Sequence, residues 1–141
     1  MLITDLLEKN AKIRPDATAL VEVNPALQPD HTVTWREYNL IESASGGKFR
    51  RETTWREFDR AANRFANLLL SRGVKKGDKV AILLMNCLEW LPIYFGILKT
   101  GALAVPMNFR YTSEEIVYCL DLADASVLVF GSEFTGRVQE A

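Results

Sequence analysis

The sequence has little of the residues that most often build metal sites and disulfide frameworks. It holds two cysteines and one histidine in 141 residues. Cys87 and Cys119 show no CxxC spacing and have no histidine nearby, which argues against a zinc site and against a disulfide framework. Both lie in apolar stretches, so we expect buried thiols. His31 stands beside Pro29 and Asp30 in a loop-like stretch, and we expect a solvated residue rather than a catalytic base.

The chain also lacks an excess of one charge and any long apolar run. Seventeen Lys and Arg residues against eighteen Asp and Glu residues give a net charge of -1, so we expect no nucleic-acid partner. No apolar run reaches the ~20 residues that a membrane-spanning helix needs. The opening lacks the basic start and apolar core of a signal peptide. We therefore expect a cytoplasmic protein without a transmembrane segment.

Phosphate-binding loops are absent from the sequence as well. It contains neither GxxxxGK[ST] nor GxGxxG. The pair Gly46-Gly47 precedes an extended-looking segment, whereas a phosphate loop opens a helix. The run 75–78, KKGD, precedes an apolar strand pattern and is expected to be a solvated turn. Glu114 and Glu115 fall in the first turn of an expected helix, where they offset its dipole. The residues alone therefore predict no catalytic residue and no metal site.

Apolar spacing predicts that helices and strands alternate along the chain. We expect helices over about 2–14, 55–72, 88–100 and 112–122, and strands over 18–23, 80–85, 102–106 and 126–130, with another helix beginning within 132–141. Strands that are apolar on both faces are typical of buried parallel sheets. The predicted fold class is therefore α/β, a partial parallel-sheet domain with flanking helices.

Polar residues before three of these helices predict how the helices begin. Thr54 with Glu57 and Thr112 with Glu115 have the spacing of capping boxes. Asn86 is expected to cap the helix over 88–100.

A near-repeat marks the region before the second helix. Residues 34–39, TWREYN, closely match residues 54–59, TWREFD, but only the second copy leads into a helical pattern. Between the copies, Gly46-Gly47 separates two extended-looking runs. We predict a hairpin-like insertion at about 33–53, with a strand pair that turns at these glycines.

Three segments together resemble the adenylate-forming superfamily, and within it the AMP-forming acyl-CoA synthetases. They are TTWREFDRAANRFANLLLSRGVKKGDKVAILLMN, EWLPIYFGILKTGALAVPMNFRYTSEE and IVYCLDLADASVLVF. The likeness is close over about 50–131 and looser over the first 23 residues. It implies that residues 1–141 are the N-terminal portion of the large domain of such an enzyme.

The resemblance implies an acid-CoA ligase in the full-length form. A carboxylic acid, for which we expect a fatty acid, would attack ATP to give an acyl-adenylate, and the CoA thiol would then displace AMP. ATP, Mg²⁺ and CoA would serve the full-length enzyme. The family's phosphate loop and catalytic lysine lie downstream of the segments matched here, so we expect this chain alone to be inactive and to hold no cofactor tightly.

The residue that the resemblance brings across is Arg110, in the motif NFRYT. In related acid-CoA ligases the arginine at this position approaches the phosphates of CoA, and a guanidinium presents a planar fork to phosphate oxygens. Phe109 and Tyr111 flank the same surface. The alternative is a surface arginine near a helix start.

Other interpretations remain open at this level. A luciferase-like enzyme or a peptide-synthetase adenylation domain would share the fold and the first half-reaction. In a different class, the chain would be a stand-alone binding or protein-interaction module derived from such an enzyme. A reading frame that continues into a phosphate loop within about 60 residues of Ala141 would decide against that module. Because a partial sheet presents open edges, we also expect the isolated chain to form a homodimer or to associate non-specifically.

Overall fold

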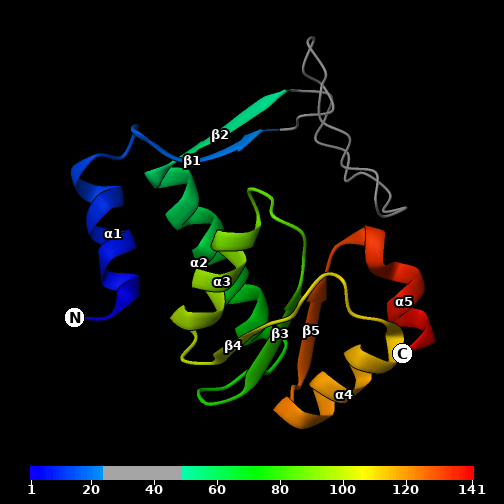
Figure 1. Ribbon diagram of the computed structural model, residues 1–141. Coiled ribbons are helices and arrows are strands. Elements are labelled where there is room, and N and C mark those ends of the chain that lie inside the picture. Colours follow the sequence, from blue (N-terminus) through cyan, green and yellow to red (C-terminus); the bar gives the residue numbers. More distant parts are fainter. Residues whose placement is uncertain (24–48) are drawn as a thin grey trace.

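The computed structural model describes residues 1–23 and 49–141, and it confirms the α/β class. Helices and strands alternate from α2 onward, as the apolar spacing predicts (Figure 1). In chain order the elements are α1 (Ile3–Ile13), β1 (Thr18–Val23), β2 (Arg50–Thr54), α2 (Trp55–Ser71), β3 (Lys79–Leu83), α3 (Trp90–Lys99), β4 (Leu103–Pro106), α4 (Ser113–Ala123), β5 (Val127–Phe130), the 3₁₀ turn η2 (Ser132–Phe134) and α5 (Thr135–Glu140).

Three parallel strands form the central sheet in the order β4-β3-β5. Val80 of β3 lies opposite Ala104 of β4 on one side and Val127 of β5 on the other. Strands β1 and β2 pair antiparallel in a separate two-stranded sheet. The strand β3 is therefore the middle of the parallel sheet and the only one of its three strands with a described neighbour on each side.

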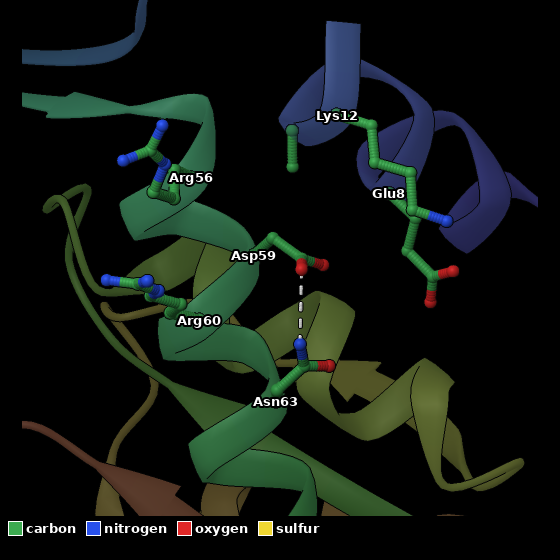
Figure 2. Close-up of a pocket in the computed structure, with 7 residues that line it drawn as sticks. Glu8, Lys12, Arg56, Asp59, Arg60 and Asn63 are labelled. Atoms are coloured by element: carbon green, nitrogen blue, oxygen red, sulfur yellow. Dashed lines mark hydrogen bonds between the residues drawn. The ribbon is translucent and has the colours of Figure 1, made fainter. Parts of the chain in front are cut away.

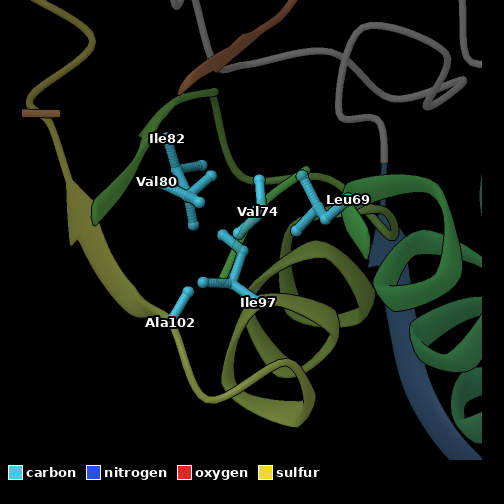
Figure 3. Packing of buried hydrophobic residues seen from close by; sticks show 6 residues of the cluster. All are labelled: Leu69, Val74, Val80, Ile82, Ile97 and Ala102. Atoms are coloured by element: carbon cyan, nitrogen blue, oxygen red, sulfur yellow. The ribbon is translucent and has the colours of Figure 1, made fainter. Parts of the chain in front are cut away.

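The middle strand is buried on both faces, as its unbroken apolar run predicts. Val80 and Ile82 point into one cluster of buried side chains, and Ala81 and Leu83 point into another. All four are at most 1% exposed. Figure 3 shows the first cluster, in which Leu69, Val74, Val80, Ile82, Ile97 and Ala102 meet between the sheet and helices α2 and α3. The second cluster brings in Ile116 of α4 and Phe134 of η2, so helical segments cover both faces of the sheet.

A third cluster joins α1 to the outer side of α2. Leu7 packs against Phe58 and Ala62, and all three are almost fully buried. Two ion pairs support the same contact. Lys99 Nζ at the end of α3 lies 2.8 Å from Glu8 Oε1 on α1 and 3.0 Å from Asp59 Oδ1 on α2. One ammonium group therefore links three helices.

The two-stranded sheet is tied to the start of α3 through a carboxylate. Glu22 of β1 forms an ion pair with Arg51 of β2 at 2.8 Å, and the backbone N–H of Leu88 donates to the same carboxylate at 2.9 Å. The hydrogen bond from Arg51 is the largest influence on Glu22 and lowers the pKa of its carboxyl. The charged carboxylate thus fixes β1 and β2 to the chain segment that leads into α3.

Both predicted capping boxes are confirmed, but the predicted cap of the third helix is wrong. The Thr54 hydroxyl accepts from the N–H of Glu57, and Thr112 does the same for Glu115. Helix α3 instead begins at Trp90, and its N-cap residue Glu89 makes no side-chain cap hydrogen bond. The chain first makes a turn after Asn86, and this turn moves the helix start beyond the reach of that side chain.

The predicted hairpin-like insertion at about 33–53 lies largely outside the described residues, as do His31, Trp35 and Gly46-Gly47. Its last part is described: Arg50–Thr54 is the strand β2, and its described partner is β1. The strand pair within 33–53 remains a prediction. None of the helices in the described ranges is long and apolar enough to cross a bilayer.

Gly96 is the point of closest approach between α3 and α2. A methyl group added there would lie 2.9 Å from the carbonyl oxygen of Ala62 and 3.0 Å from a ring carbon of Phe65. The site is buried, so the backbone of α2 would have to move. The absence of a side chain at this position thus sets the distance between the two helices.

We expect Gly96→Ala to lower the free energy of unfolding by about 1 to 3 kcal/mol, because overpacking outweighs the higher helix propensity of alanine. The matched control is Gly136→Ala on α5, where an added methyl meets nothing within 4 Å. That change should leave stability unaltered or raise it by up to about 1 kcal/mol. Urea unfolding of the two variants measures both effects, and equal stability for both would contradict this packing argument.

Candidate functional site

The carboxyl ends of the three parallel strands place three loops at one edge of the sheet. They are the segments 84–89 after β3, 107–112 after β4 and 131–134 after β5. In open α/β sheets, ligands bind at this edge, beyond the carboxyl ends of the strands. Backbone hydrogen bonds continue the pairing past the strands, from Met107 N to Ile82 O at 2.9 Å and from Gly131 N to Leu83 O at 3.1 Å. We take this carboxyl edge as the candidate site.

Arg110 lies in the loop 107–112 after the outer strand β4, where the structure presents it at the surface. Asn108 builds the local turn: its side-chain oxygen accepts from the N–H of Arg110 at 3.0 Å, and its carbonyl accepts from the N–H of Tyr111 at 3.1 Å. The guanidinium carbon of Arg110 lies 5.5 Å from the ring centroid of Phe109. Because Met107 is buried at the start of the loop, the turn projects Arg110 outward from a fixed base.

A second arginine holds this loop from the side of α5. Arg137 Nη1 donates to the carbonyl of Phe109 at 2.8 Å and to the carbonyl of Tyr111 at 3.1 Å. Its guanidinium carbon lies 5.6 Å from the ring centroid of Phe134, which is fully buried. The two bonded carbonyls therefore belong to the residues on either side of Arg110.

Tyr111 itself is an uncharged neighbour of Arg110. Its phenol lies next to Cys119 of α4, and the proximity of that thiol is the largest influence that raises the pKa of Tyr111. At neutral pH the phenol therefore keeps its proton. Within the loop 107–112, the guanidinium of Arg110 is the charged side chain.

The first loop of the carboxyl edge borders a cavity of about 330 Å³ lined by Asn86, Cys87, Trp90 and Leu91. Trp90 stacks on Tyr94 with ring centroids 5.4 Å apart. Burial is the main influence on Cys87 and raises the pKa of its thiol to about 11. A thiol with this pKa is protonated at neutral pH and is a poor nucleophile or metal ligand.

Cys87 and Cys119 are half-buried, so the prediction of buried thiols is only partly right. Cys119 packs against the second cluster from a partly exposed face of α4, and Cys87 lies in the loop before α3, where it lines a cavity. No group of three or more His, Cys, Asp or Glu side chains within residues 1–23 and 49–141 could hold a metal ion.

A larger cavity of about 390 Å³ lies between α1 and α2, away from the carboxyl edge. Figure 2 shows Asp59 and Asn63 of α2 near Glu8 and Lys12 of α1, with Arg56 and Arg60 on the α2 side. Asp59 accepts from Asn63 Nδ2 at 3.1 Å and, like Glu8, pairs with Lys99. Burial alone would lower the pKa of Lys99, but the bonds to Glu8 and Asp59 outweigh it and raise the pKa. The acidic groups of this cavity are therefore engaged in holding α1 in place.

The structure also places the other candidates that the sequence singles out. Glu115 serves the capping box, and Glu114 lies exposed in the first turn of α4. The KKGD run is a turn, in which Lys75 N donates to Asp78 Oδ2 at 2.7 Å. It precedes β3 and so lies at the opposite end of that strand from the carboxyl edge. Neither feature joins Arg110.

Arg137 and Asn108 are the residues of this site that sequence reasoning missed. Asn108 has a detectable signal, since asparagine often starts a turn by accepting from the N–H two residues on. Arg137 has none, because its partners are backbone carbonyls 26 and 28 positions away.

The comparisons with known proteins agree with this α/β architecture. The family model described as "AMP-binding enzyme" matches residues 7–141. The crotonobetaine/carnitine–CoA ligase of Escherichia fergusonii is 40% identical over 101 residues, which are 72% of this chain and 19% of that relative.

Two solved structures superpose on almost the whole of this chain. The N-terminal domain of FACL13 from Mycobacterium tuberculosis superposes with a TM-score of 0.75 at 25% identity, over 98% of this chain and 29% of that one. A fatty acyl CoA synthetase from the same organism gives a TM-score of 0.74 at 25% identity, over 98% and 23%.

The chain belongs to the AMP-binding enzyme family. The predicted resemblance to the N-terminal part of adenylate-forming acyl-CoA synthetases is confirmed. The chain spans about a fifth, 19%, of the length of the crotonobetaine/carnitine–CoA ligases that it matches.

We expect Cys87 to react slowly with iodoacetamide. A pKa of about 11, against an ordinary value of 9.0, lowers the thiolate fraction at pH 8 by roughly 100-fold. Peptide mapping by mass spectrometry separates Cys87 from Cys119, and the chain unfolded in denaturant serves as the control. Equal alkylation rates for Cys87 in the folded and unfolded chain would contradict the raised pKa.

Proposed function

We propose that this chain is the N-terminal part of an acid-CoA ligase. In the full-length enzyme, a carboxylic acid attacks ATP to give an acyl-adenylate and pyrophosphate, and the thiol of CoA then displaces AMP to give the acyl-CoA. The observation that carries the proposal is the family match over residues 7–141 together with 40% identity to a CoA ligase.

The substrate that we propose is a fatty acid. The support is the structural similarity to a fatty acyl CoA synthetase. The sequence relative is named for crotonobetaine and carnitine, which are acids of a different kind. Of the two cavities, one lies between α1 and α2 and the other beside the loop before α3, and we assign the acyl chain to neither.

Within the chain, we propose that Arg110 binds a phosphate group of CoA. The exposed guanidinium stands at the carboxyl edge, on a turn fixed by Asn108. A guanidinium can donate two parallel hydrogen bonds to one phosphate, and such charge-assisted bonds are about twice as strong as neutral ones. ATP and Mg²⁺ would be held by other parts of the enzyme, because no residue described here forms a phosphate-binding loop at a helix start.

Arg110→Ala in the full-length ligase should raise the KM for CoA by at least about 10-fold, because a charge-assisted hydrogen bond contributes roughly 1.5 to 3 kcal/mol. The rate of acyl-adenylate formation, measured by pyrophosphate exchange, should not change. Arg64→Ala on the exposed side of α2 is the matched control. Unaltered CoA kinetics in Arg110→Ala would reject this assignment.

We also expect the 141-residue chain alone neither to bind Mg-ATP with useful affinity nor to form an acyl-adenylate. The reaction needs donors around the triphosphate and positive charge near the departing pyrophosphate. The cationic run Lys75-Lys76 lies in the turn before β3, and its neighbour Asp78 accepts from the backbone of that turn. Calorimetric titration with Mg-ATP and pyrophosphate exchange over a panel of carboxylic acids test this expectation. Measurable exchange by the purified chain would overturn it and would favour an activity of the chain on its own.

Association of the isolated chain is a further part of the proposal. Strands β4 and β5 are the outer strands of the described parallel sheet, and Leu103 and Phe130 on them are 55% and 38% exposed. Exposed strand edges with apolar side chains pair readily with other chains. A homodimer or non-specific association would cover these edges.

A further inference from the structure

One side chain from another element bonds to the loop that carries Arg110. Arg137 of α5 donates from a single nitrogen, Nη1, to the carbonyl oxygens of Phe109 and Tyr111. Because these residues directly precede and follow Arg110, the two bonds fix the backbone on both sides of it. The direction in which Arg110 leaves the loop therefore depends on the position of Arg137.

The guanidinium of Arg137 is itself held in place. It lies over the ring of Phe134, which is fully buried in the cluster beneath β3 and α4. A second bond, from Ser113 Oγ to Glu140 Oε2 at 2.8 Å, ties the far end of α5 to the residue that opens α4. The helix α5 is thus bonded to the loop 107–112 through Arg137 and to the first residue of α4 through Glu140, and the ring of Phe134 beside Arg137 is fixed in the core.

We propose that Arg137 is a positioning residue: it holds the loop 107–112 in the conformation that presents Arg110 to a phosphate of CoA. The inference rests on the proposed function, since it concerns the same site. Arginine suits this task better than lysine, because the planar guanidinium reaches two carbonyls in a fixed geometry and loses little freedom for each bond formed. A bond from a charged donor to a backbone carbonyl is also stronger than a neutral one.

A purely structural role would predict something different. If Arg137 only added stability, its removal would lower the melting temperature and would affect both half-reactions alike. A positioning role acts on the step that uses Arg110 and spares the step that does not. Measuring both the KM for CoA and the rate of acyl-adenylate formation therefore distinguishes the two roles.

The experiment uses the full-length ligase with Arg137→Ala, Arg137→Gln, Arg137→Lys and the control Arg64→Ala. Hydrogen exchange of peptides that cover residues 107–112 should become at least about 10-fold faster in Arg137→Ala, because the bonds that order the loop are lost. The KM for CoA should rise by about 5- to 50-fold, with pyrophosphate exchange within twofold of the unmodified enzyme. Arg137→Lys should recover part of the loss, and Arg64→Ala should change nothing.

A double variant tests whether the two arginines act through one interaction. In the Arg110→Ala background, Arg137→Ala should add less than about a threefold further rise in the KM for CoA, since coupled residues are not additive. If Arg137→Ala does not fold, Arg137→Gln carries the same comparison, because its side chain is shorter and uncharged and so removes the charge-assisted bonds to Phe109 and Tyr111.

The outcomes separate this inference from the proposed function. A raised KM in Arg110→Ala beside an unchanged one in Arg137→Ala overturns the positioning role and leaves the CoA assignment standing. An unchanged KM in Arg110→Ala overturns the CoA assignment, and the positioning role for CoA falls with it. Equal losses in both half-reactions, or unchanged hydrogen exchange over 107–112 in Arg137→Ala, also overturn the positioning role.

Discussion

The described part of this chain depends on one strand that has no exposed face. In β3, alternate residues point to opposite sides of the sheet, and all of Val80, Ala81, Ile82 and Leu83 are apolar and buried. Each large side chain among them contributes about 1.5 to 3 kcal/mol by leaving water. Both faces must then be covered, which requires α2 and α3 on one side and α4 with η2 on the other. The loops of the carboxyl edge take their positions from this layered arrangement.

Farther from the sheet, charge contributes to the packing. Lys99 stands at the junction of three helices, with its side chain only 10% exposed, and two carboxylates offset the cost of its burial. Apolar contacts around Leu7 hold α1 against α2, but they do not by themselves define its angle. The ion pairs to Glu8 and Asp59 add directional contacts to this layer.

The parts of the fold that could be predicted are those specified by neighbouring residues. The apolar run of β3 indicates two-sided burial, and the spacing of Thr54 and Glu57 indicates a helix start, because both signals depend on contacts within a few positions. Helix α3 starts later than apolar spacing predicts, because the N–H of Leu88 bonds to Glu22 on a distant strand and holds the turn after Asn86. The helix propensity of neighbouring residues cannot predict a hydrogen bond to a residue so distant in the sequence.

The candidate site likewise contains one residue that could be predicted and one that could not. Arg110 could be named from the motif around it, and the fold places it at the carboxyl edge of the sheet. Its supporting residue Arg137 could not be found, because an arginine that bonds backbone carbonyls leaves no pattern in the types of residue that it contacts. The cysteines are half-exposed because of how α4 and the loop before α3 pack against the rest of the chain. The spacing of apolar residues does not predict that packing.

The pairing of β1 with β2 brings together two chain segments that are separated in the sequence. Val23 lies opposite Arg50, so the ends of the intervening stretch are brought together by a strand pair that is itself tied to Leu88 through Glu22. The entropy lost on closing a loop grows only with the logarithm of its length, about 0.6 kcal/mol for each doubling. The register of β1 with β2 is set by their own pairing and by the bond to Leu88, so a change in the number of residues between Val23 and Arg50 does not by itself alter it.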